Sequence, residues 1–136
     1  MYERFNQQAR NLILFFLKKY FGDSENLCAP LNPLEINANE EEMNQIFHSN
    51  DYNEDYKILF KKTRSYRENI PPLINAYMNL SPTMKSFGTT VNSDFGNVEE
   101  TAIMITIADL FESKVQRHVN TYKRINHYLK KRKFLL

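Results

Sequence analysis

One segment near the start of the chain is apolar on almost every side, and this constrains the fold more than any other feature of the sequence. Apolar residues recur at helical spacing from residue 5 to residue 20, and the run 12–17 (LILFFL) nearly closes the ring. Such a helix is stable in water only when neighbours cover most of it. The spacing therefore predicts a helix over residues 2–20 that is buried or awaits a partner, with Gly22 as a left-handed stop.

The rest of the chain must supply that cover. A length of 136 residues allows one compact domain. Hydrophobic residues make up 42% of the chain, with ten Phe, eight Tyr, three Gly and five Pro, so we expect a real core and mostly regular elements. This composition excludes disordered, collagen-like and disulfide-stapled chains. The single cysteine, Cys28, fits a reducing compartment, and we expect it to be a small buried side chain rather than a catalytic thiol.

Turn-forming residues divide the next part of the chain into short helices. Asn39 and Asp51 each precede a polar first turn, as helix-capping residues do. Pro71 or Pro72 fits the first turn of a later helix, where a missing N–H has no cost. The predicted elements are a connector (23–39) that contains a short edge strand (34–36), followed by helices over 40–47, 52–67 and 73–80.

The pattern changes to strands after residue 82. Residues 84–91 read as a strand in which Gly88 marks a bulge or a close backbone approach, and residues 92–97 read as a turn. The run 101–107 (TAIMITI) is nearly continuously apolar, which is typical of a strand covered on both faces. A final helix begins at Ser113. The predicted fold is therefore mixed α/β (α+β), with four to five helices around a small mixed sheet.

Charge is distributed unevenly along the chain. Residues 1–113 carry 10 basic and 16 acidic side chains, a net of −6, whereas residues 114–136 carry eight basic and no acidic ones. We therefore divide the chain into residues 1–112 and a basic amphipathic helix over 113–136. This helix has three interpretations: packing on the domain, binding to an anionic membrane surface, and binding to nucleic acid, of which the last is least favoured. Its membrane-binding cluster would be Lys130, Lys131, Arg132 and Lys133.

Carboxylates beside the last predicted strand are the candidate catalytic groups. Asp94 precedes this strand, and Glu99 and Glu100 lead directly into it. A carboxylate at the mouth of a strand can act as a general base toward an amine nucleophile. The residue types alone favour the alternative, in which Asp94 caps the turn and the glutamates are solvated. The sequence has no nucleotide-binding glycine pattern, zinc pattern or nucleophile elbow, and its three histidines share no ligand spacing, so we expect neither a metal nor a bound cofactor.

Four runs of sequence carry information that composition does not. They are residues 50–59 (NDYNEDYKIL), 69–82 (NIPPLINAYMNLSP), 87–89 (FGT) and 94–101 (DFGNVEET). These runs resemble segments of a family of bacterial lipid N-acyltransferases, described as hemolysin-like or as ornithine- and glycine-lipid N-acyltransferases. The resemblance covers about residues 5–119, and runs 70–82 and 94–101 are its most specific parts.

The resemblance implies a variant of the GNAT acyltransferase fold. It implies transfer of a 3-hydroxy fatty acyl group from acyl carrier protein to the amine of an amino acid, in the synthesis of membrane aminolipids. The match is to the C-terminal half of such an enzyme, so the donor site would lie in an N-terminal half or a partner subunit. We then expect a chain that is inactive alone, located in the cytoplasm or on the inner face of the membrane.

Residue roles follow from this comparison as expectations. Asp94, Glu99 and Glu100 are the candidate catalytic carboxylates. A half fold also predicts that strand 101–107 is paired on one side only or that its sheet has an open edge. The competing class is a non-catalytic module that docks a partner or a membrane through the first helix and the basic tail. The candidate substrate-binding residues are Asp51, Tyr52, Tyr77 and Gly88.

Overall fold

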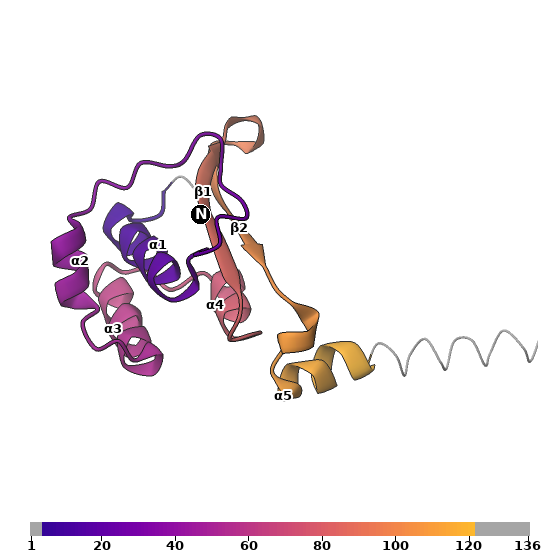
Figure 1. Ribbon diagram of the computed structural model, residues 1–136. Coiled ribbons are helices and arrows are strands. Elements are labelled where there is room, and N and C mark those ends of the chain that lie inside the picture. The colour runs from indigo at the N-terminus through magenta and orange to yellow at the C-terminus, as the bar shows by residue number, and fades with distance from the viewer. Residues whose placement is uncertain (1–3, 122–136) are drawn as a thin grey trace, which may run out of the picture.

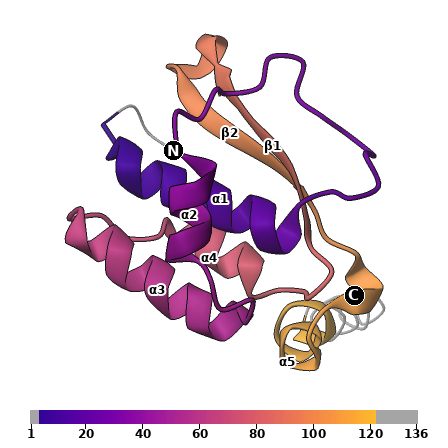
Figure 2. The ribbon, with the colours of Figure 1, turned by 60° about the vertical axis from the view of Figure 1, so that its left-hand side comes forward.

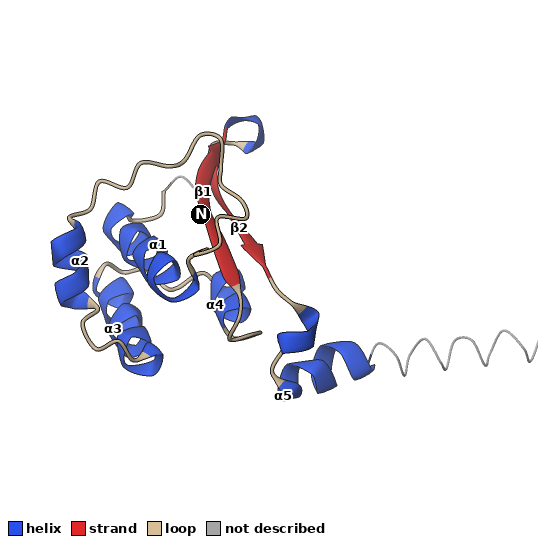
Figure 3. Cartoon of the chain, viewed as in Figure 1, coloured by secondary structure: helices blue, strands red, loops and turns tan. Residues whose placement is uncertain are grey.

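The computed structural model describes residues 4–121, and its architecture is a helical layer against a two-stranded antiparallel sheet (Figures 1 and 3). Helices α1, α2 and α3 lie together on one side of the β-hairpin (Figure 2). The predicted mixed α+β class with a small sheet is confirmed. The elements are α1 (Gln7–Phe21), α2 (Glu40–Ile46), α3 (Tyr52–Ser65), α4 (Pro72–Met78), β1 (Lys85–Asn92), β2 (Val98–Met104) and α5 (Glu112–Lys114).

Helix α1 is the centre of the core. It begins later than predicted because Asn6 caps it, accepting hydrogen bonds from the backbone N–H groups of Gln8 and Ala9. Its apolar side chains are buried, and the Phe16 ring packs against four aromatic rings from α1, α2's end and α3. The first helix therefore offers no exposed apolar face for a partner, which corrects that part of the docking hypothesis. The buried residues of α1 are Ala9, Asn11, Leu12, Ile13, Leu14, Phe16, Leu17 and Phe21.

Gly22 ends α1, but not in the left-handed conformation that the sequence suggested. Its φ is −59° and its ψ is 143°, which is extended backbone. The reason for glycine here is space: a Cβ would lie 2.4 Å from the backbone oxygen of Lys18. The chain therefore leaves α1 in an extended path toward the sheet rather than in a tight reversal.

The predicted caps of the next helices are confirmed. The Asn39 side chain accepts a hydrogen bond from the Glu41 N–H at the start of α2. The Asp51 side chain accepts one from the Glu54 N–H at the start of α3, 2.9 Å away. Pro71 precedes α4 and Pro72 is its first residue, so the proline rule also placed this helix correctly.

The hairpin has the predicted bulge but differs in its second strand. The register between β1 and β2 shifts between Ser86 and Thr89, and Gly88 has a φ of +102°. Strand β2 begins at Val98 rather than at residue 101 and ends at Met104. Its side chains alternate between half-buried and exposed, so the expected cover on both faces is wrong. The apolar run was misleading because helices pack on one face only of this part of the sheet.

The two outer edges of the hairpin differ. The connector runs along β1: the Leu34 N–H donates to the Thr89 oxygen at 2.7 Å, and the Thr90 hydroxyl donates to the Asn32 oxygen at 2.7 Å. These contacts do not form the edge strand predicted at 34–36, because only one backbone bond joins that stretch to β1. Within residues 4–121, β2 pairs with β1 alone, so the predicted one-sided pairing is confirmed.

The described chain ends in short helical turns. A 3₁₀ turn (Ile107–Asp109) leads into α5, and a π-helical turn (Val115–Asn120) follows, at the end of the hairpin away from the β1–β2 turn (Figure 1). Val115 and Val119 are half-buried, in line with the predicted apolar stripe. Most of the predicted basic helix, including its four-residue cluster at 130–133, lies outside the described residues. Among the described helices, none is long and apolar enough to cross a bilayer.

Candidate functional site: an apolar groove along strand β2

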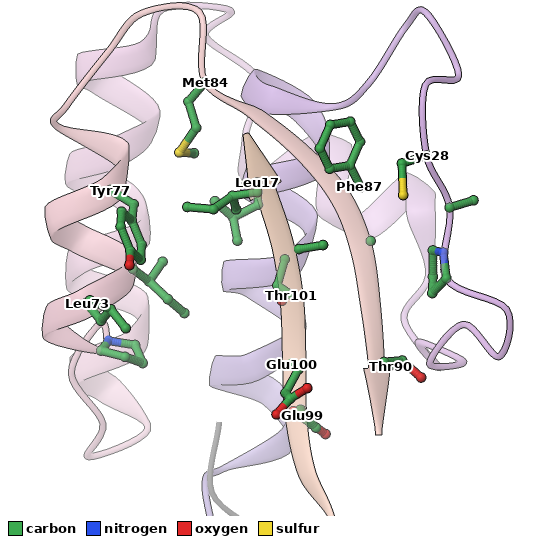
Figure 4. Close-up of a pocket in the computed structure, with 17 residues that line it drawn as sticks. Leu17, Cys28, Leu73, Tyr77, Met84, Phe87, Thr90, Glu99, Glu100 and Thr101 are labelled. Atoms are coloured by element: carbon green, nitrogen blue, oxygen red, sulfur yellow. The ribbon is translucent and has the colours of Figure 1, made fainter. Parts of the chain in front are cut away.

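An apolar groove of about 680 Å³ runs along β2, between α4 on one flank and the connector on the other (Figure 4). Leu17 of α1 and Met84, both buried, also line it. Leu73 and Tyr77 form the α4 wall, and Leu73 remains 63% exposed. The other lining residues are Cys28, Ala29, Pro30, Pro71, Ile74, Phe87, Gly88, Thr90, Glu99, Glu100, Thr101, Ala102 and Ile103.

The connector wall is held by ion pairs at the start of β1. Lys85 Nζ lies 2.8 Å from a carboxylate oxygen of Glu25 and 3.6 Å from one of Asp23. Burial favours the neutral Asp23 carboxyl, but backbone N–H groups that donate to it, together with Lys85, outweigh burial and lower its pKa. The pairing with both carboxylates raises the pKa of Lys85 against the opposing effect of its burial. The segment that carries Cys28 is therefore tied to the sheet.

Gly88 allows this wall to approach the sheet closely. A Cβ at this position would lie 3.2 Å from Cδ of the Pro30 ring, and the φ of +102° is one that L side chains rarely adopt. Cys28 is exposed on the same wall, which corrects the expected buried thiol. This part of the connector lies on the surface, whereas Leu34 and Ala38 farther along it pack against the core.

Both glutamates lie at one end of the groove, away from Met84 and Cys28 (Figure 4). They belong to β2 itself instead of leading into it, because the strand begins at Val98. An oxygen of Glu99 lies 2.6 Å from the Arg10 guanidinium on α1. The side chains of Glu99 and Arg10 are 15% and 14% exposed. Glu100 is exposed and accepts a hydrogen bond from Asn92 Nδ2 at 3.1 Å. Adjacent carboxylates thus have different surroundings.

The structure brings together four of the seven predicted catalytic and substrate-binding residues: Glu99, Glu100, Tyr77 and Gly88 line the groove. Asp94 does not, because it is exposed in the 3₁₀ turn (Ser93–Phe95) that joins the two strands. The remaining two lie at the N-terminus of α3, Asp51 as its cap and Tyr52 as its first residue.

Asp51 and Tyr52 have structural surroundings. Asp51 caps α3, as described above. Tyr52 stacks among the rings of Phe16, Tyr20, Phe21 and Tyr56, and burial raises its pKa to about 12. Its buried hydroxyl has no hydrogen-bond partner within the described residues. Neither residue reaches the groove, so a substrate-binding role has no geometric support at these positions.

A buried charged cluster on α3 was missed by the sequence analysis. Asp55 is fully buried, and it accepts hydrogen bonds from Lys19 Nζ at 2.8 Å and from the Tyr20 hydroxyl at 2.6 Å. The Ser49 hydroxyl donates to its other oxygen, and Lys19 also donates to the Phe47 backbone oxygen. Burial alone would raise the pKa of Asp55, but these donors outweigh it and lower the pKa. A charged residue within an otherwise apolar helix face was the available signal.

The described residues contain no group of three or more side chains suited to hold a metal ion. The groove offers an apolar wall, the ion pair of Arg10 and Glu99, and the exposed carboxylate of Glu100. That set is suited to binding an apolar chain and to accepting a proton at one end of it.

Comparison with known proteins finds relatives by sequence alone. No protein-family model matches the chain, and no solved structure matches it. The chain is 47% identical over 122 residues to a protein named Glycine N(alpha)-acyltransferase from Bacteroides thetaiotaomicron, which covers 90% of this chain and 36% of the relative. A protein of the same name from Phocaeicola vulgatus is 46% identical over 90% of this chain and 37% of its own length. The chain is therefore similar to one part of proteins named as acyltransferases, and it spans a little over a third of the length of the curated relatives it matches.

Proposed function

We propose that this chain is one part of an N-acyltransferase that joins an acyl group to the amine of a small amino acid. The supporting observation is the 47% identity, along 90% of the chain, to a protein named for acyl transfer to glycine. The donor is a 3-hydroxyacyl thioester of acyl carrier protein, as the sequence resemblance implies. The product is an aminolipid with an amide bond.

The chemistry requires a place for one proton. The amine nitrogen forms a bond to the thioester carbon, the C–S bond breaks, the thiol leaves, and the nitrogen must lose a proton to a base. Glu99 is held by Arg10 at 2.6 Å, so its carboxylate is committed to an ion pair. Glu100 has no ion pair within the described residues and is open to solvent. We therefore assign the proton-accepting role to Glu100.

The chain would work as part of a larger assembly. The relatives it matches are nearly three times as long as the matched region, and the outer edge of β2 has no strand partner within residues 4–121. An additional strand from a longer polypeptide or a partner subunit can pair with such an edge through backbone hydrogen bonds. We expect the 136-residue chain alone to form no N-acylated amino acid, because the site that binds acyl carrier protein would lie in the remaining part.

The test is a chimera in which residues 5–121 replace the matching segment of the Bacteroides relative. We expect N-acylglycine in cells or extracts that contain the chimera and an acyl carrier protein thioester, measured by mass spectrometry. Glu100→Gln should lower the rate about 100-fold or more, as loss of a general base does. Asp94→Asn, which removes a nearby exposed carboxylate outside the groove, should not change it. A folded chimera with no product, or equal rates in both variants, would contradict this assignment.

The basic tail would bring the enzyme to its lipid product. Residues 114–136 carry eight basic and no acidic side chains. Basic residues near an anionic surface each contribute about 1 kcal/mol, reduced by salt. We propose that residues 130–133 contact anionic head groups on the inner face of the membrane, so that the enzyme is cytoplasmic and peripheral. Vesicle sedimentation should show salt-sensitive binding of the full chain to anionic lipid, and much weaker binding of a chain ended at Lys123.

A further inference from the structure

We propose that the groove along β2 binds a single aliphatic chain whose head group is not an anion. The chain lies along the strand, and the head lies at the end that carries Glu99 and Glu100. This inference deepens the proposed function and rests on it for one point only: the aliphatic chain would be the acyl group that is transferred. The binding itself is argued from the groove.

The dimensions and lining fit such a ligand. A groove of about 680 Å³ lies within the range of small-molecule sites, which is about 300–1,000 Å³. Its walls come from α4, the β-hairpin and the connector, and Leu17 of α1 adds to the lining. Aliphatic and aromatic side chains, among them Leu17, Leu73, Met84, Phe87 and Ile103, supply most of the lining. The lining of the groove is therefore mostly apolar.

The groove is also built rather than incidental. Lys85 ties the connector to β1 through Glu25 and Asp23, and Gly88 lets the Pro30 ring approach the strand. These contacts hold one wall in place without a ligand. A flat face that waits for another protein segment needs no such wall. We therefore favour a small amphiphile over a protein segment as the occupant.

The charge at the end of the groove selects the head group. Among the described residues, Arg10 pairs with Glu99 and no cation lies beside Glu100, so these residues leave one carboxylate without a balancing charge at this end. A carboxylate or phosphate head would meet Glu100 directly and be repelled, whereas a neutral thioester or an ammonium group would not. The groove should therefore accept an activated acyl group or an amine and reject the free fatty acid.

Cys28 provides a probe that does not depend on activity. It is the single cysteine of the sequence, it is exposed, and it lines the groove near the end opposite the glutamates. The experiment measures the rate at which iodoacetamide, a neutral reagent, alkylates the full 136-residue chain. The three probes are decylamine, decanol and decanoate, which share one chain length and differ in head charge.

We expect decylamine and decanol to protect Cys28. A probe present at ten times its Kd should slow alkylation about tenfold. Decanoate should need at least about fivefold more probe for the same protection, because its head meets Glu100. Glu100→Gln should reduce this difference between head groups, and Asp94→Asn should leave it unchanged.

A matched pair of leucines tests the position of the chain. Leu73 lies in the groove and is 63% exposed, whereas Leu31 lies outside it and is 98% exposed. Both can become Asp without opening the core, and Asp suits the first turn of α4. Leu73→Asp should abolish protection at concentrations that protect the unaltered chain, and Leu31→Asp should not.

Three outcomes overturn the inference: no protection by any probe, equal protection by all three heads, and equal protection in both leucine variants. The first would indicate that a protein segment covers the groove. Failure of the proposed function is distinguishable, because it would appear as a folded chimera without product while Cys28 remains protected by decanol.

Discussion

The helical layer and the groove side of this molecule differ in how completely they are covered. In the helical layer, Phe16 and Leu59 are fully buried, and even the charged Asp55 is surrounded by donors. On the groove side, Leu73 and Met104 stay exposed, and β2 has one open edge within residues 4–121. The side chains of the helical layer are covered by other residues of the chain, whereas the groove side leaves apolar surface open to a ligand or a partner. Stability and binding should therefore respond to different residues.

The strongest test of this contrast is truncation of a core residue against truncation of a groove residue. Leu59→Ala should lower the free energy of unfolding by about 3 kcal/mol, because it leaves a cavity in the core. Leu73→Ala should change it by less than about 0.5 kcal/mol, because the side chain is already exposed. Urea denaturation followed by circular dichroism measures both. Similar losses at the two positions would mean that the groove side is part of the core.

Loss of the buried Asp55 carboxylate should give an effect of similar size. Asp55→Asn leaves Lys19 without its partner, and we expect a loss of about 3 kcal/mol near neutral pH. Asp94→Asn, in an exposed turn, serves as the control. Unfolding midpoints in urea give both values.

Asp55 should also contribute to the loss of folding stability at acid pH. The pKa of Asp55 is lower in the folded chain than its usual 3.8, so the unfolded chain takes up the proton first as the pH falls. Its contribution to stability is present above about pH 4 and disappears as the pH drops through the folded pKa. Unfolding midpoints measured between about pH 6 and pH 3 should therefore fall less steeply for Asp55→Asn than for the unaltered chain. Parallel pH profiles would exclude this role.

Glycine replacements sharpen the comparison within the hairpin. Gly88→Ala should cost about 2 kcal/mol, because φ is +102° and the new Cβ meets Pro30. Gly96→Ala should cost about 1 kcal/mol: the φ of +68° disfavours alanine, but an added Cβ would meet no other atom. In Gly88→Ala, amide hydrogens of β1 and of the groove wall should exchange faster, and those of α1 and α3 should remain protected. Loss of protection throughout the helices would show that the two regions unfold as one unit.

The contact between the regions should give the smallest effect. Arg10→Gln removes the ion pair to Glu99, whose two side chains are 14% and 15% exposed, and we expect a loss of about 1 kcal/mol. Amide hydrogens of β2 should exchange faster in Arg10→Gln than in the unaltered chain at low salt. This difference in exchange rate should become smaller at high salt. Lys57→Gln, which removes an exposed pair within α3, is the control and should have almost no effect.

The parts of the fold that local chemistry determines were predictable from the sequence. Asn39, Asp51 and Pro72 start their helices where expected, because a cap or a first-turn proline acts on the next few residues. The cover of β2 was not predictable, since an apolar run does not reveal how many elements pack on it. Cys28 was placed in the core only because small thiols often lie there.

The candidate site was predictable in part. Glu99, Glu100, Tyr77 and Gly88 were singled out from the sequence and line one groove. The partner of Glu99 was not foreseen, because Arg10 is 89 residues away and only the packing of α1 on the sheet brings them together. The prediction for Asp94 was wrong because this residue is close to β2 in sequence but lies in the turn before the strand. Closeness in sequence therefore did not place its side chain in the groove.

The extra residue in β1 affects the geometry of the whole distal hairpin. Three steps along β1, from Ser86 to Thr89, match two steps along β2, from Ile103 to Thr101. Ser86 and Thr89 are both buried, although an unbroken strand would place them on opposite faces. The same residues paired without this bulge would therefore exchange inside and outside for every position from Thr89 to Asn92. The number of residues in this short stretch, as much as their chemistry, decides which side chains the groove displays.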